Sequence, residues 1–384
     1  MLSLDLSAAF DSIDHELMLS DLFHLGIRGK AHELLSSYLL GRSVKVCATS
    51  PNSASSPKPL LFGVPQGSVM GPLLYIVYTR SLTDLLDRIN FKYHVYADDT
   101  QVYIDFDHND IDFIKDKLSN VFMAIKNWML SRRLKINPSK TNIMVFCPDS
   151  KKSEVHTKIG NFSLDGEIIS ISSQAKNLGI IFDSDLNFGP QINSVIKKCN
   201  FALHNLRQVK KYIPRKLFLQ VVHGEVLSRI DYCNIIYFGL PKYQLRRLQL
   251  IINKAARLVL GLKYRDPITD HLRNLHWLPI GPRIDFKCLL LIQKATKFNQ
   301  PAYIRNLFEY SHSQRLSSLK FRLPIGKHEF AFRAIFYHGP RIYFKLPKAL
   351  KNENNIEKFK TGLKTFLFIK GFDHKLESII NYDP

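Results

Sequence analysis

The first part of the chain alternates between short strand patterns and amphipathic helix patterns. Residues 2–6 alternate leucine with polar residues, a period of two that predicts a strand. Alternating apolar residues over 91–106 predict a hairpin with Asp98 and Asp99 at its tip. The clearest helix is predicted over 110–133, where apolar residues form a continuous stripe at helical spacing.

Shorter signals fill the space between these elements. Asp110 is the expected N-cap of the long helix, and Asp11 and Asp14 are expected in the first turn of the first helix. Further helices are predicted at 18–25, 31–39 and 73–89. Further strands are predicted at 44–48, 142–146 and 177–182, with a Pro/Ser-rich loop at 51–59.

From Pro190 onwards the pattern becomes helical and basic. Apolar residues at helical spacing predict one helix over 192–209 and another over 245–259. The outer faces of both carry many lysines and arginines. The first 185 or so residues therefore indicate an α+β fold, and the remainder indicates a mainly helical one.

The net charge of the chain indicates what kind of partner it binds. There are 54 Lys and Arg residues against 33 Asp and Glu, which leaves a formal net charge of +21. Such an excess favours a polyanion, because each phosphate that is neutralised releases counterions. A protein that is merely basic, or one that binds anionic membrane, is the alternative explanation. The five cysteines show no paired spacing, which argues against a zinc ribbon and a disulfide scaffold.

The same composition gives an expectation about location. No apolar run approaches the roughly 20 residues that cross a bilayer, so no membrane association is expected. The N-terminal residues lack a basic segment and turn acidic at once, unlike a signal peptide. We therefore expect an intracellular protein, in the nucleus, the cytoplasm or both.

Three aspartates are the strongest candidates for chemistry. Asp98 and Asp99 alone are typical of a solvated turn. Asp5 changes that interpretation, because an acid between Leu4 and Leu6 suits a metal ligand better than a packing role. Three carboxylates from two strands could bind two Mg²⁺ ions about 3.5–4 Å apart. Such a site activates a 3′-hydroxyl and stabilises a pyrophosphate leaving group.

A glycine- and proline-rich segment follows the predicted loop. It covers Gly63–Pro72 and reads GVPQGSVMGP. Its glycines alone favour a plain irregular loop. With Gln66 between Pro65 and Gly67, the backbone could approach a base pair or an incoming nucleotide closely.

Several motifs together resemble a known family. These are LDLSAAFDSIDH, GVPQGSVMGPLLY, YADDT, NWMLSRRLKINPSKTNIMVF and NLGIIFDSDLNF, followed by LRRLQLIINKAARLVLGL and ITDHLRNLHWLPIGPRIDFK. In this order they resemble the reverse transcriptases of non-LTR (LINE-type) retrotransposons, especially the jockey-like group of animals. The resemblance runs through nearly all of the chain.

The resemblance implies a fold class and three domains. It implies an α+β polymerase palm, with an antiparallel sheet and helices on one face, over residues 1–188. It implies a helical, basic thumb over 189–264 and a C-terminal tail region over 265–384. Aromatic and basic residues of that tail, such as Arg341 and Tyr343, could stack on single-stranded nucleic acid or pack a small helical core.

The resemblance also implies roles near the acids. Asp5 and Asp98 would be the principal metal ligands, and Asp99 a supporting catalytic acid that also binds metal. Phe10 would be the aromatic gate that excludes a ribose 2′-hydroxyl, although a core phenylalanine is the alternative.

Other positions would contact the substrates. Leu6, Gln66 and Gly67 would line the nucleotide site. Lys140 would be catalytic and protonate the leaving pyrophosphate, with a surface lysine after a turn as the alternative. Two further residues would hold the primer terminus, Leu178 and Gly179.

The implied activity is RNA-directed DNA polymerisation, with two Mg²⁺ ions for which Mn²⁺ can substitute. The implied partners are an RNA template, a DNA primer and dNTPs. The chain departs from the family because only four residues precede Asp5, which leaves out the fingers and an upstream endonuclease. The alternative is therefore an inactive remnant that only binds nucleic acid.

Overall fold

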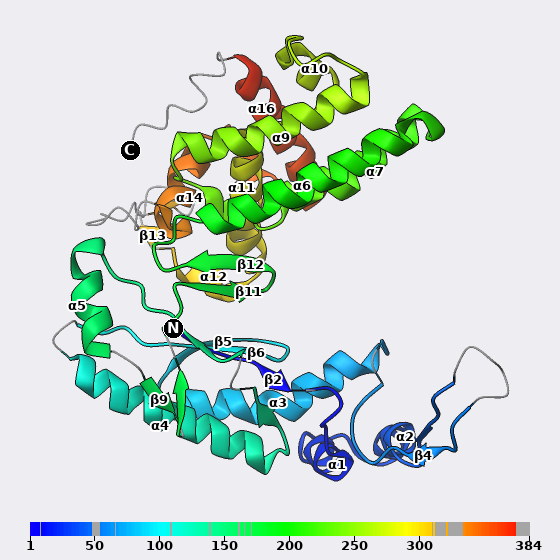
Figure 1. Cartoon of the computed structure of the whole chain (residues 1–384), viewed down its shortest axis with the longest axis vertical. Coiled ribbons are helices and arrows are strands. Elements are labelled where there is room, and N and C mark those ends of the chain that lie inside the picture. The colour runs from blue at the N-terminus through cyan, green and yellow to red at the C-terminus, as the bar shows by residue number, and fades with distance from the viewer. Residues whose placement is uncertain are drawn as a thin grey trace. The chain divides into compact units, whose positions relative to one another are not determined.

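A computed structural model shows the chain as two compact units, Met1–Leu186 and Asn187–Pro384 (Figure 1). The predicted division into 1–188, 189–264 and 265–384 stays a prediction. The structure describes residues 1–7, 9–47, 54–65, 67–107, 110–137, 140–159, 162–164, 166–169, 171–308, 310–311, 320–321 and 333–373.

The first unit mixes helices with short strands. Its helices are α1 (His15–His24), α2 (Lys30–Leu39), α3 (Met70–Arg88), α4 (Ile111–Ser131) and α5 (Asp149–Ile159). Its strands are β1 (Leu2–Leu4), β2 (Leu6–Ser7), β3 (Ser43–Val44), β4 (Lys58–Pro59), β5 (Lys92–Tyr96), β6 (Asp99–Tyr103), β7 (Lys135–Ile136), β8 (Asn142–Ile143), β9 (Phe162–Leu164), β10 (Glu167–Ile169), β11 (Gln174–Asn177) and β12 (Ile180–Asp183).

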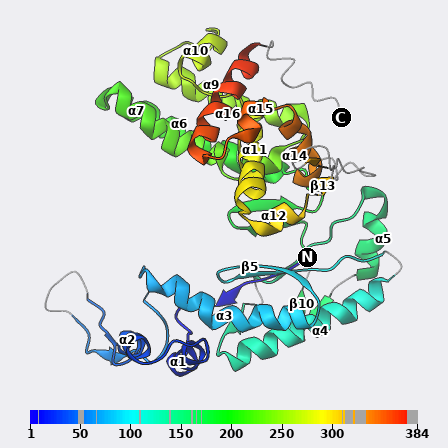
Figure 2. The same cartoon turned by 180° about the vertical axis from the view of Figure 1, so that it is seen from behind.

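A four-stranded antiparallel sheet in the order β5-β6-β1-β8 forms the centre of this unit. Helices α3 and α4 run along one face of it, as Figures 1 and 2 both show. Leu2 of β1 and Val102 of β6 are fully buried, as are Tyr78 of α3 and Ile125 of α4. The predicted α+β class with an antiparallel sheet is thus confirmed.

The helix patterns located helices well and strand lengths less well. The predicted helix over 110–133 is α4, although Asp110 makes no side-chain capping hydrogen bond. Asp14 precedes α1 and caps it, because its Oδ1 accepts from the Leu17 amide at 3.0 Å. Asp11 also lies before that helix, so the predicted place in the first turn was wrong for both acids, and Glu16 is the acidic residue there.

Three strand predictions were wrong in their extent. The predicted strand 142–146 is paired as β8 only at Asn142–Ile143. The predicted strand 44–48 is paired as β3 only at Ser43–Val44, and its last residue, Ala48, lies outside the described residues. The predicted strand 177–182 is interrupted at Leu178–Gly179, where the chain turns between β11 and β12. Alternation of apolar and polar residues does not reveal a turn when apolar residues also occupy the turn.

An arginine pair holds the end of α4 against the first helices. The Arg132 guanidinium pairs with the Asp21 carboxylate and lies 4.2 Å from the centre of the Tyr78 ring. Arg133 Nε lies 2.8 Å from Asp14 Oδ2. Both arginines therefore join segments that are far apart in the sequence, and so stabilise the layer beneath the sheet.

The second unit is mainly helical in its described part. Its α-helices are α6 (Gly189–Val209), α7 (Arg215–Val222), α8 (Ser228–Asp231), α9 (Lys242–Leu260), α10 (Thr269–Asn274), α11 (Ile280–Phe298), α12 (Ala302–Asn306), α14 (Ile335–Phe344), α15 (Lys348–Asn352) and α16 (Ile356–Asp373). The other elements are η2 (Lys210–Tyr212), the π-helix η3 (His223–Leu227), η4 (Asn234–Tyr237), β13 (Tyr310–Ser311) and β14 (Lys320–Phe321).

Helix α11 forms the centre of this unit. Its apolar residues Leu289 and Ile292 are buried with Phe359 and Leu363 of α16. Within the described residues, none of the helices is both long and apolar enough to cross a bilayer.

Candidate active site

Asp5 lies at the junction of β1 and β2, next to the central pair of strands. Leu4 is paired with Thr100 in the antiparallel register of β1 and β6. Asp5 follows Leu4 and Asp99 precedes Thr100, so the antiparallel pairing brings both acids to the same end of the two strands. The Asp5 carbonyl also accepts from the Asn137 amide at 2.9 Å, which fixes the strand end.

The β5–β6 hairpin places the two adjacent acids differently. Asp99 is the first residue of β6 and pairs with Tyr96, so the turn consists of Ala97 and Asp98. Ala97 has a φ of 50°, in the left-handed region. The prediction that both acids lie at the tip was therefore wrong for Asp99.

The three aspartates affect one another electrostatically. Burial raises the pKa of the Asp99 carboxyl, and the nearby Asp98 and Asp5 carboxylates raise it further, while Lys140 lowers it. Burial likewise raises the pKa of the Tyr75 hydroxyl, with added contributions from Asp98 and Asp99. A carboxyl whose pKa is raised by its neighbours is typical of functional sites, where like charges are held together at a cost in stability.

This repulsion predicts a stability effect. The folded chain holds the Asp99 proton more tightly than the unfolded chain does, so the stabilisation from protonation is lost as the pH rises through the raised pKa. Asp99→Asn should therefore raise the melting temperature at pH 7. The gain should shrink as the pH falls towards the ordinary carboxyl value of 3.8. Thermal denaturation followed by circular dichroism measures both, with Asp84→Asn on the exposed side of α3 as control. A melting temperature that is equal to or below that of the wild type at pH 7 would contradict the repulsion.

Lys140 is the cation that accompanies these acids. Its Nζ lies 3.1 Å from Asp5 Oδ2, and the lysine side chain is 64% exposed while that of Asp5 is 24% exposed. The Asp5 Oδ2 atom itself is buried and accepts no hydrogen bond within the described residues, because the contact with Lys140 is a charge contact without hydrogen-bond geometry. Lys140 therefore supplies charge to the acid cluster from the solvent side.

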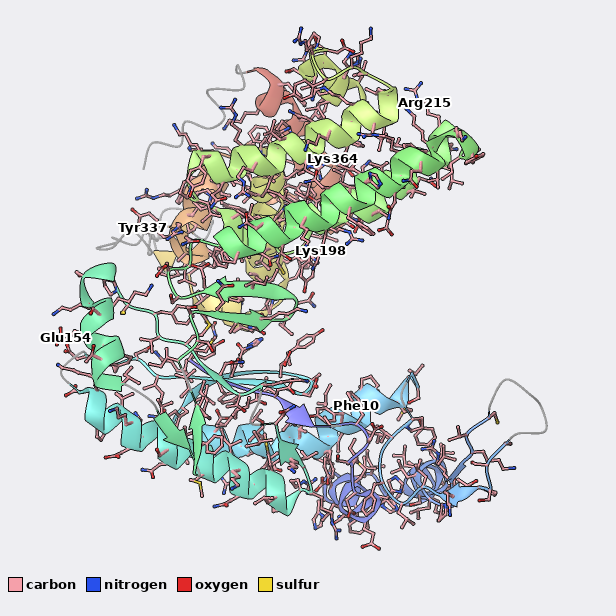
Figure 3. The ribbon with its side chains drawn as sticks, in the orientation of Figure 1. Phe10, Glu154, Lys198, Arg215, Tyr337 and Lys364 are labelled. Carbon is pink, nitrogen blue, oxygen red and sulfur yellow. The ribbon has the colours of Figure 1, made fainter. Side chains whose placement is uncertain are left out.

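Phe10 lies against α3, and sequence reasoning missed its partner. The rings of Phe10 and Tyr75 stack with their centres 4.8 Å apart, and Phe10 is labelled in Figure 3. Tyr75 is 1% exposed, and its hydroxyl has no hydrogen-bond partner within the described residues. The sequence does contain one signal for this contact. Tyr75 lies on the apolar face of a predicted helix, and a hydroxyl buried there is unusual without a hydrogen-bond partner or a functional role.

The glycine-rich segment is tied to the chain around Phe10. The Val64 amide donates to the Phe10 carbonyl at 3.0 Å. Gly63 has a φ of +87°, and a Cβ there would lie 3.0 Å from the backbone of Asp11, so glycine is required. Gly67 also has a positive φ, of +81°, but faces open space.

Two of the predicted nucleotide-contacting residues are Gln66 and Leu6. Gln66 lies outside the described residues. The Leu6 side chain is 6% exposed and belongs to the hydrophobic core, and Leu6 pairs with Ile136. A nucleotide contact at Leu6 would therefore come from its main chain.

Leu178 and Gly179 form the turn of the β11–β12 hairpin, a two-stranded sheet separate from the central one. Their φ angles are 45° and 82°. Two positive angles in succession are those of a type I′ turn, which commonly has Asn-Gly rather than Leu-Gly. The leucine is therefore held in an unfavourable conformation at the hairpin tip.

The three aspartates are a candidate place for metal ions. Asp5 offers a buried carboxylate oxygen without a hydrogen bond, and its neighbours repel one another, so added positive charge fits the cluster. Within the part of the chain that the structure describes, however, no three His, Cys, Asp or Glu side chains already have the arrangement to hold a metal ion. The chemistry of the donors fits hard divalent cations, and their present spacing is that of a cluster balanced by lysine.

Known proteins resemble this chain over about 70% of its length. Residues 1–182 match the family model for reverse transcriptase (RNA-dependent DNA polymerase). The chain is 29% identical over 283 residues to the probable RNA-directed DNA polymerase from transposon BS of Drosophila melanogaster. This alignment covers 71% of the chain and 30% of that protein.

Two further relatives come from mobile elements. The RNA-directed DNA polymerase from mobile element jockey of Drosophila funebris is 29% identical over 299 residues, covering 73% of this chain and 30% of that protein. The probable RNA-directed DNA polymerase from transposon X-element of Drosophila melanogaster is 26% identical, covering 68% of this chain and 28% of that protein. The chain thus spans about 30% of the length of these curated relatives. Residues 1–182 therefore belong to the reverse transcriptase family, and the chain is similar to the RNA-directed DNA polymerases of jockey and other Drosophila mobile elements.

Proposed function

We propose that this chain is the polymerase core of an RNA-directed DNA polymerase, which joins dNTPs to the 3′-hydroxyl of a DNA primer on an RNA template. One observation carries the proposal. Asp5 and Asp99 are far apart in the sequence but flank the paired residues Leu4 and Thr100 at the same end of β1 and β6, and the charges of Asp5 and Asp98 both raise the pKa of Asp99. A core packing role does not need three such carboxylates in one place.

Asp5, Asp98 and Asp99 would hold two divalent cations, Mg²⁺ or Mn²⁺. When bound, such ions neutralise phosphate oxygens and make a primer hydroxyl a better nucleophile. The chain itself holds these acids at the ends of two central strands and places the Lys140 ammonium group beside Asp5. The Lys140 side chain, which is largely exposed, is free to turn from Asp5 towards a leaving pyrophosphate and give it a proton.

The segment around Phe10 would shape the sugar pocket. The Phe10 ring stacks on the buried Tyr75, which fixes its position. The charges of Asp98 and Asp99 act on the Tyr75 hydroxyl, so Phe10 is close to the acid cluster. A rigid aromatic at this place leaves room for a deoxyribose and collides with a 2′-hydroxyl. The adjoining glycine-rich segment, with Gln66 and Gly67, would approach the base pair.

Primer extension tests the proposal. The full chain is incubated with an RNA template, an annealed DNA primer, dNTPs and Mg²⁺ or Mn²⁺, and products are resolved by length. Stepwise elongation that stops at the template end is expected. A chain that binds the primer–template but never extends it, with either metal ion, would instead be the binding-only remnant.

The Phe10 gate gives a selective effect. Phe10→Ala should weaken discrimination against ribonucleotides by about 10- to 200-fold, the range for contacts of this size. Single-nucleotide incorporation of dNTP and rNTP measures the ratio of kcat/KM values. Tyr75→Phe keeps the stacked ring and should retain the discrimination. If Phe10→Ala changes both substrates equally, Phe10 only packs the core.

The Leu178 turn separates stability from primer binding. Leu178→Gly should stabilise the first unit by about 0.5–1 kcal/mol, because glycine adopts a positive φ without the steric cost that leucine incurs. If Leu178 contacts the primer, KM for the primer should rise at the same time. Chemical denaturation and steady-state kinetics measure the two effects. An unchanged KM in a more stable protein would remove the primer role.

A further inference from the structure

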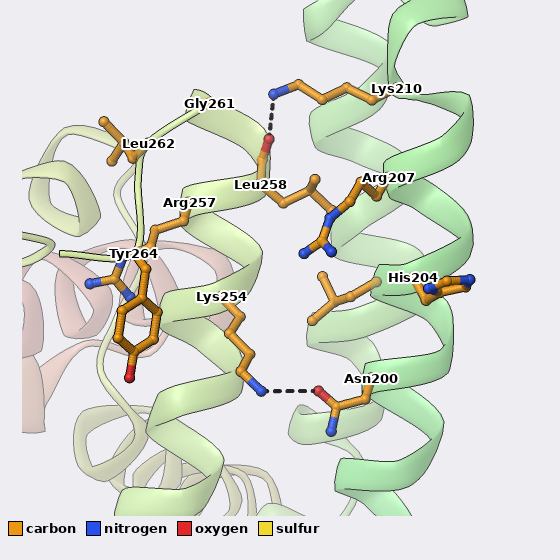
Figure 4. Close-up of a pocket in the computed structure, with 11 residues that line it drawn as sticks. Asn200, His204, Arg207, Lys210, Lys254, Arg257, Leu258, Gly261, Leu262 and Tyr264 are labelled. Carbon is orange, nitrogen blue, oxygen red and sulfur yellow. Dashed lines mark hydrogen bonds between the residues drawn. The ribbon is translucent and has the colours of Figure 1, made fainter. Parts of the chain in front are cut away.

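The second unit contains a cavity that the polymerase site does not use. It has a volume of about 610 Å³ and lies between the C-terminal halves of α6 and α9 (Figure 4). That volume is within the range of sites that enclose a ligand. The cavity lies entirely within one unit, so its walls are set by the packing of the two helices.

The walls carry positive charge without compensation. Four of the lining residues are lysine or arginine and none is acidic. Lys210 Nζ donates to the Leu258 carbonyl at 2.6 Å, and Lys254 Nζ donates to Asn200 Oδ1 at 3.4 Å. These partners are neutral, so both hydrogen bonds hold the ammonium groups in place and leave their charge available to an anion.

Arg207 and Arg257 extend the charged surface. The Arg207 guanidinium lies between the two helices in Figure 4, and it has no ion pair within the described residues. Arg257 donates to the Asp266 carbonyl at 3.1 Å, while its Nε is buried with no hydrogen-bond partner. A buried donor without a partner costs free energy unless a ligand satisfies it.

An aromatic platform stands next to these cations. Tyr264 is 84% exposed, and the Arg257 guanidinium carbon lies 5.9 Å from the centre of its ring. The Tyr264 ring is therefore open to a ligand from the solvent side. Its free face is suited to stacking on a nucleobase, with the arginine strengthening the contact.

The length of the charged row indicates what kind of anion fits. The lining runs from Asn200 in α6 to Lys210 at the start of η2, about 15 Å along the helix axis. Lys254 carries the positive charge at the Asn200 end, because its Nζ contacts Asn200 Oδ1. A single phosphate reaches only one part of such a row. A strand with successive phosphates reaches all of it, and an aromatic beside a cationic groove is the usual combination for single strands.

We propose that the cavity between α6 and α9 binds single-stranded nucleic acid, with phosphates along Arg207, Lys210 and Lys254 and one base on Tyr264. This site belongs to the second unit, whereas the three aspartates belong to the first. It shares with the proposed function only a nucleic-acid partner, so one can fail without the other.

Binding of a labelled oligouridylate tests the proposal, with a length of about 12 nucleotides to suit a single-strand groove. Fluorescence anisotropy of the full chain is measured over a salt series. The double variant Arg207→Gln/Lys254→Gln should reduce the slope of log K against log salt by about 1.4, because each lost phosphate contact contributes about 0.7. Tyr264→Leu should weaken binding about tenfold at constant salt slope.

Matched controls remove charge or an aromatic elsewhere in the same unit. Lys297→Gln/Lys358→Gln removes two exposed lysines from α11 and α16, and Tyr303→Leu removes an exposed tyrosine from α12. These should leave the affinity within about twofold and the salt slope unchanged. If the controls lower the affinity as much as the cavity variants do, binding is a property of the net charge and the site is overturned.

Further binding measurements identify the class of ligand and distinguish this site from the proposed polymerase site. A duplex of the same length should bind more weakly than the single strand, and so should vesicles that contain phosphatidylserine. Preference for either of these over the single strand would overturn the proposal. Asp98→Asn should bind the oligonucleotide like the wild type, so a loss of polymerase activity leaves this result intact.

Discussion

Asp98→Asn is expected to reduce primer extension by at least about 10²–10³-fold, while the protein stays folded. Removing one preorganised electrostatic group from an active site commonly costs this much, and removing a metal ligand costs more. The substituted side chain keeps nearly the same shape and loses the negative charge. Single-nucleotide incorporation on an RNA template under single-turnover conditions measures the rate of chemistry.

The control is Asp84→Asn, which removes the same charge from the exposed side of α3. It should extend primers at the wild-type rate. Oligonucleotide affinity measured in parallel should be unchanged in both variants, which would place the Asp98 effect in chemistry. If Asp98→Asn extends primers like the control, the acid cluster is not the catalytic site.

Lys140→Gln is expected to lower the rate of incorporation by about 10²–10⁴-fold, the range for loss of a general acid. The structure gives this lysine a second possible role, because its Nζ lies 3.1 Å from Asp5 Oδ2. Lys140→Arg separates the two. Arginine keeps the positive charge beside Asp5, but it holds its protons too tightly to donate one.

The outcome of the arginine variant therefore decides the role. If Lys140 is the general acid, both variants should be slow. If it only balances the Asp5 charge, Lys140→Arg should recover most of the rate. Lys135→Gln, which removes an exposed lysine from the neighbouring β7, should be as active as the wild type. Wild-type activity in Lys140→Gln would exclude both roles.

Strong periodicity made the elements of the first unit predictable. The apolar stripe over 110–133 gave α4 to within two residues at each end, because a long amphipathic helix is determined by its own sequence. The alternating arms around Asp98 gave the β5–β6 hairpin for the same reason. The capping of these elements was less predictable, because Asp110 and Asp14 have the same residue type and only Asp14 caps.

Turns were the weakest part of the prediction. The apolar run over 177–182 continues through Leu178, so nothing in a period of two reveals that the chain reverses there. The position of Asp99 shows the same limit. Whether an acid lies in a turn or begins a strand depends on one residue of register, and the register is set by pairing with another strand.

The candidate residues could be named from the sequence, but their contacts could not. Tyr75 looked like one more apolar position of a helix, and only the packing of α3 shows that it supports Phe10. The contact of Lys140 with Asp5 joins residues that are distant in the chain. The groove between α6 and α9 likewise exists only because two helices pack together.

The sequence by itself determined the family, the helical and strand segments with strong periods, the positive net charge and the identity of three aspartates. These are properties of residue type and local spacing, which the chain carries without folding. Tertiary structure alone decided that Asp5 meets Asp99, that lysine balances them and that cations gather between two helices. Those facts depend on strand register and helix packing, which are free-energy minima of the whole chain and not of any one segment.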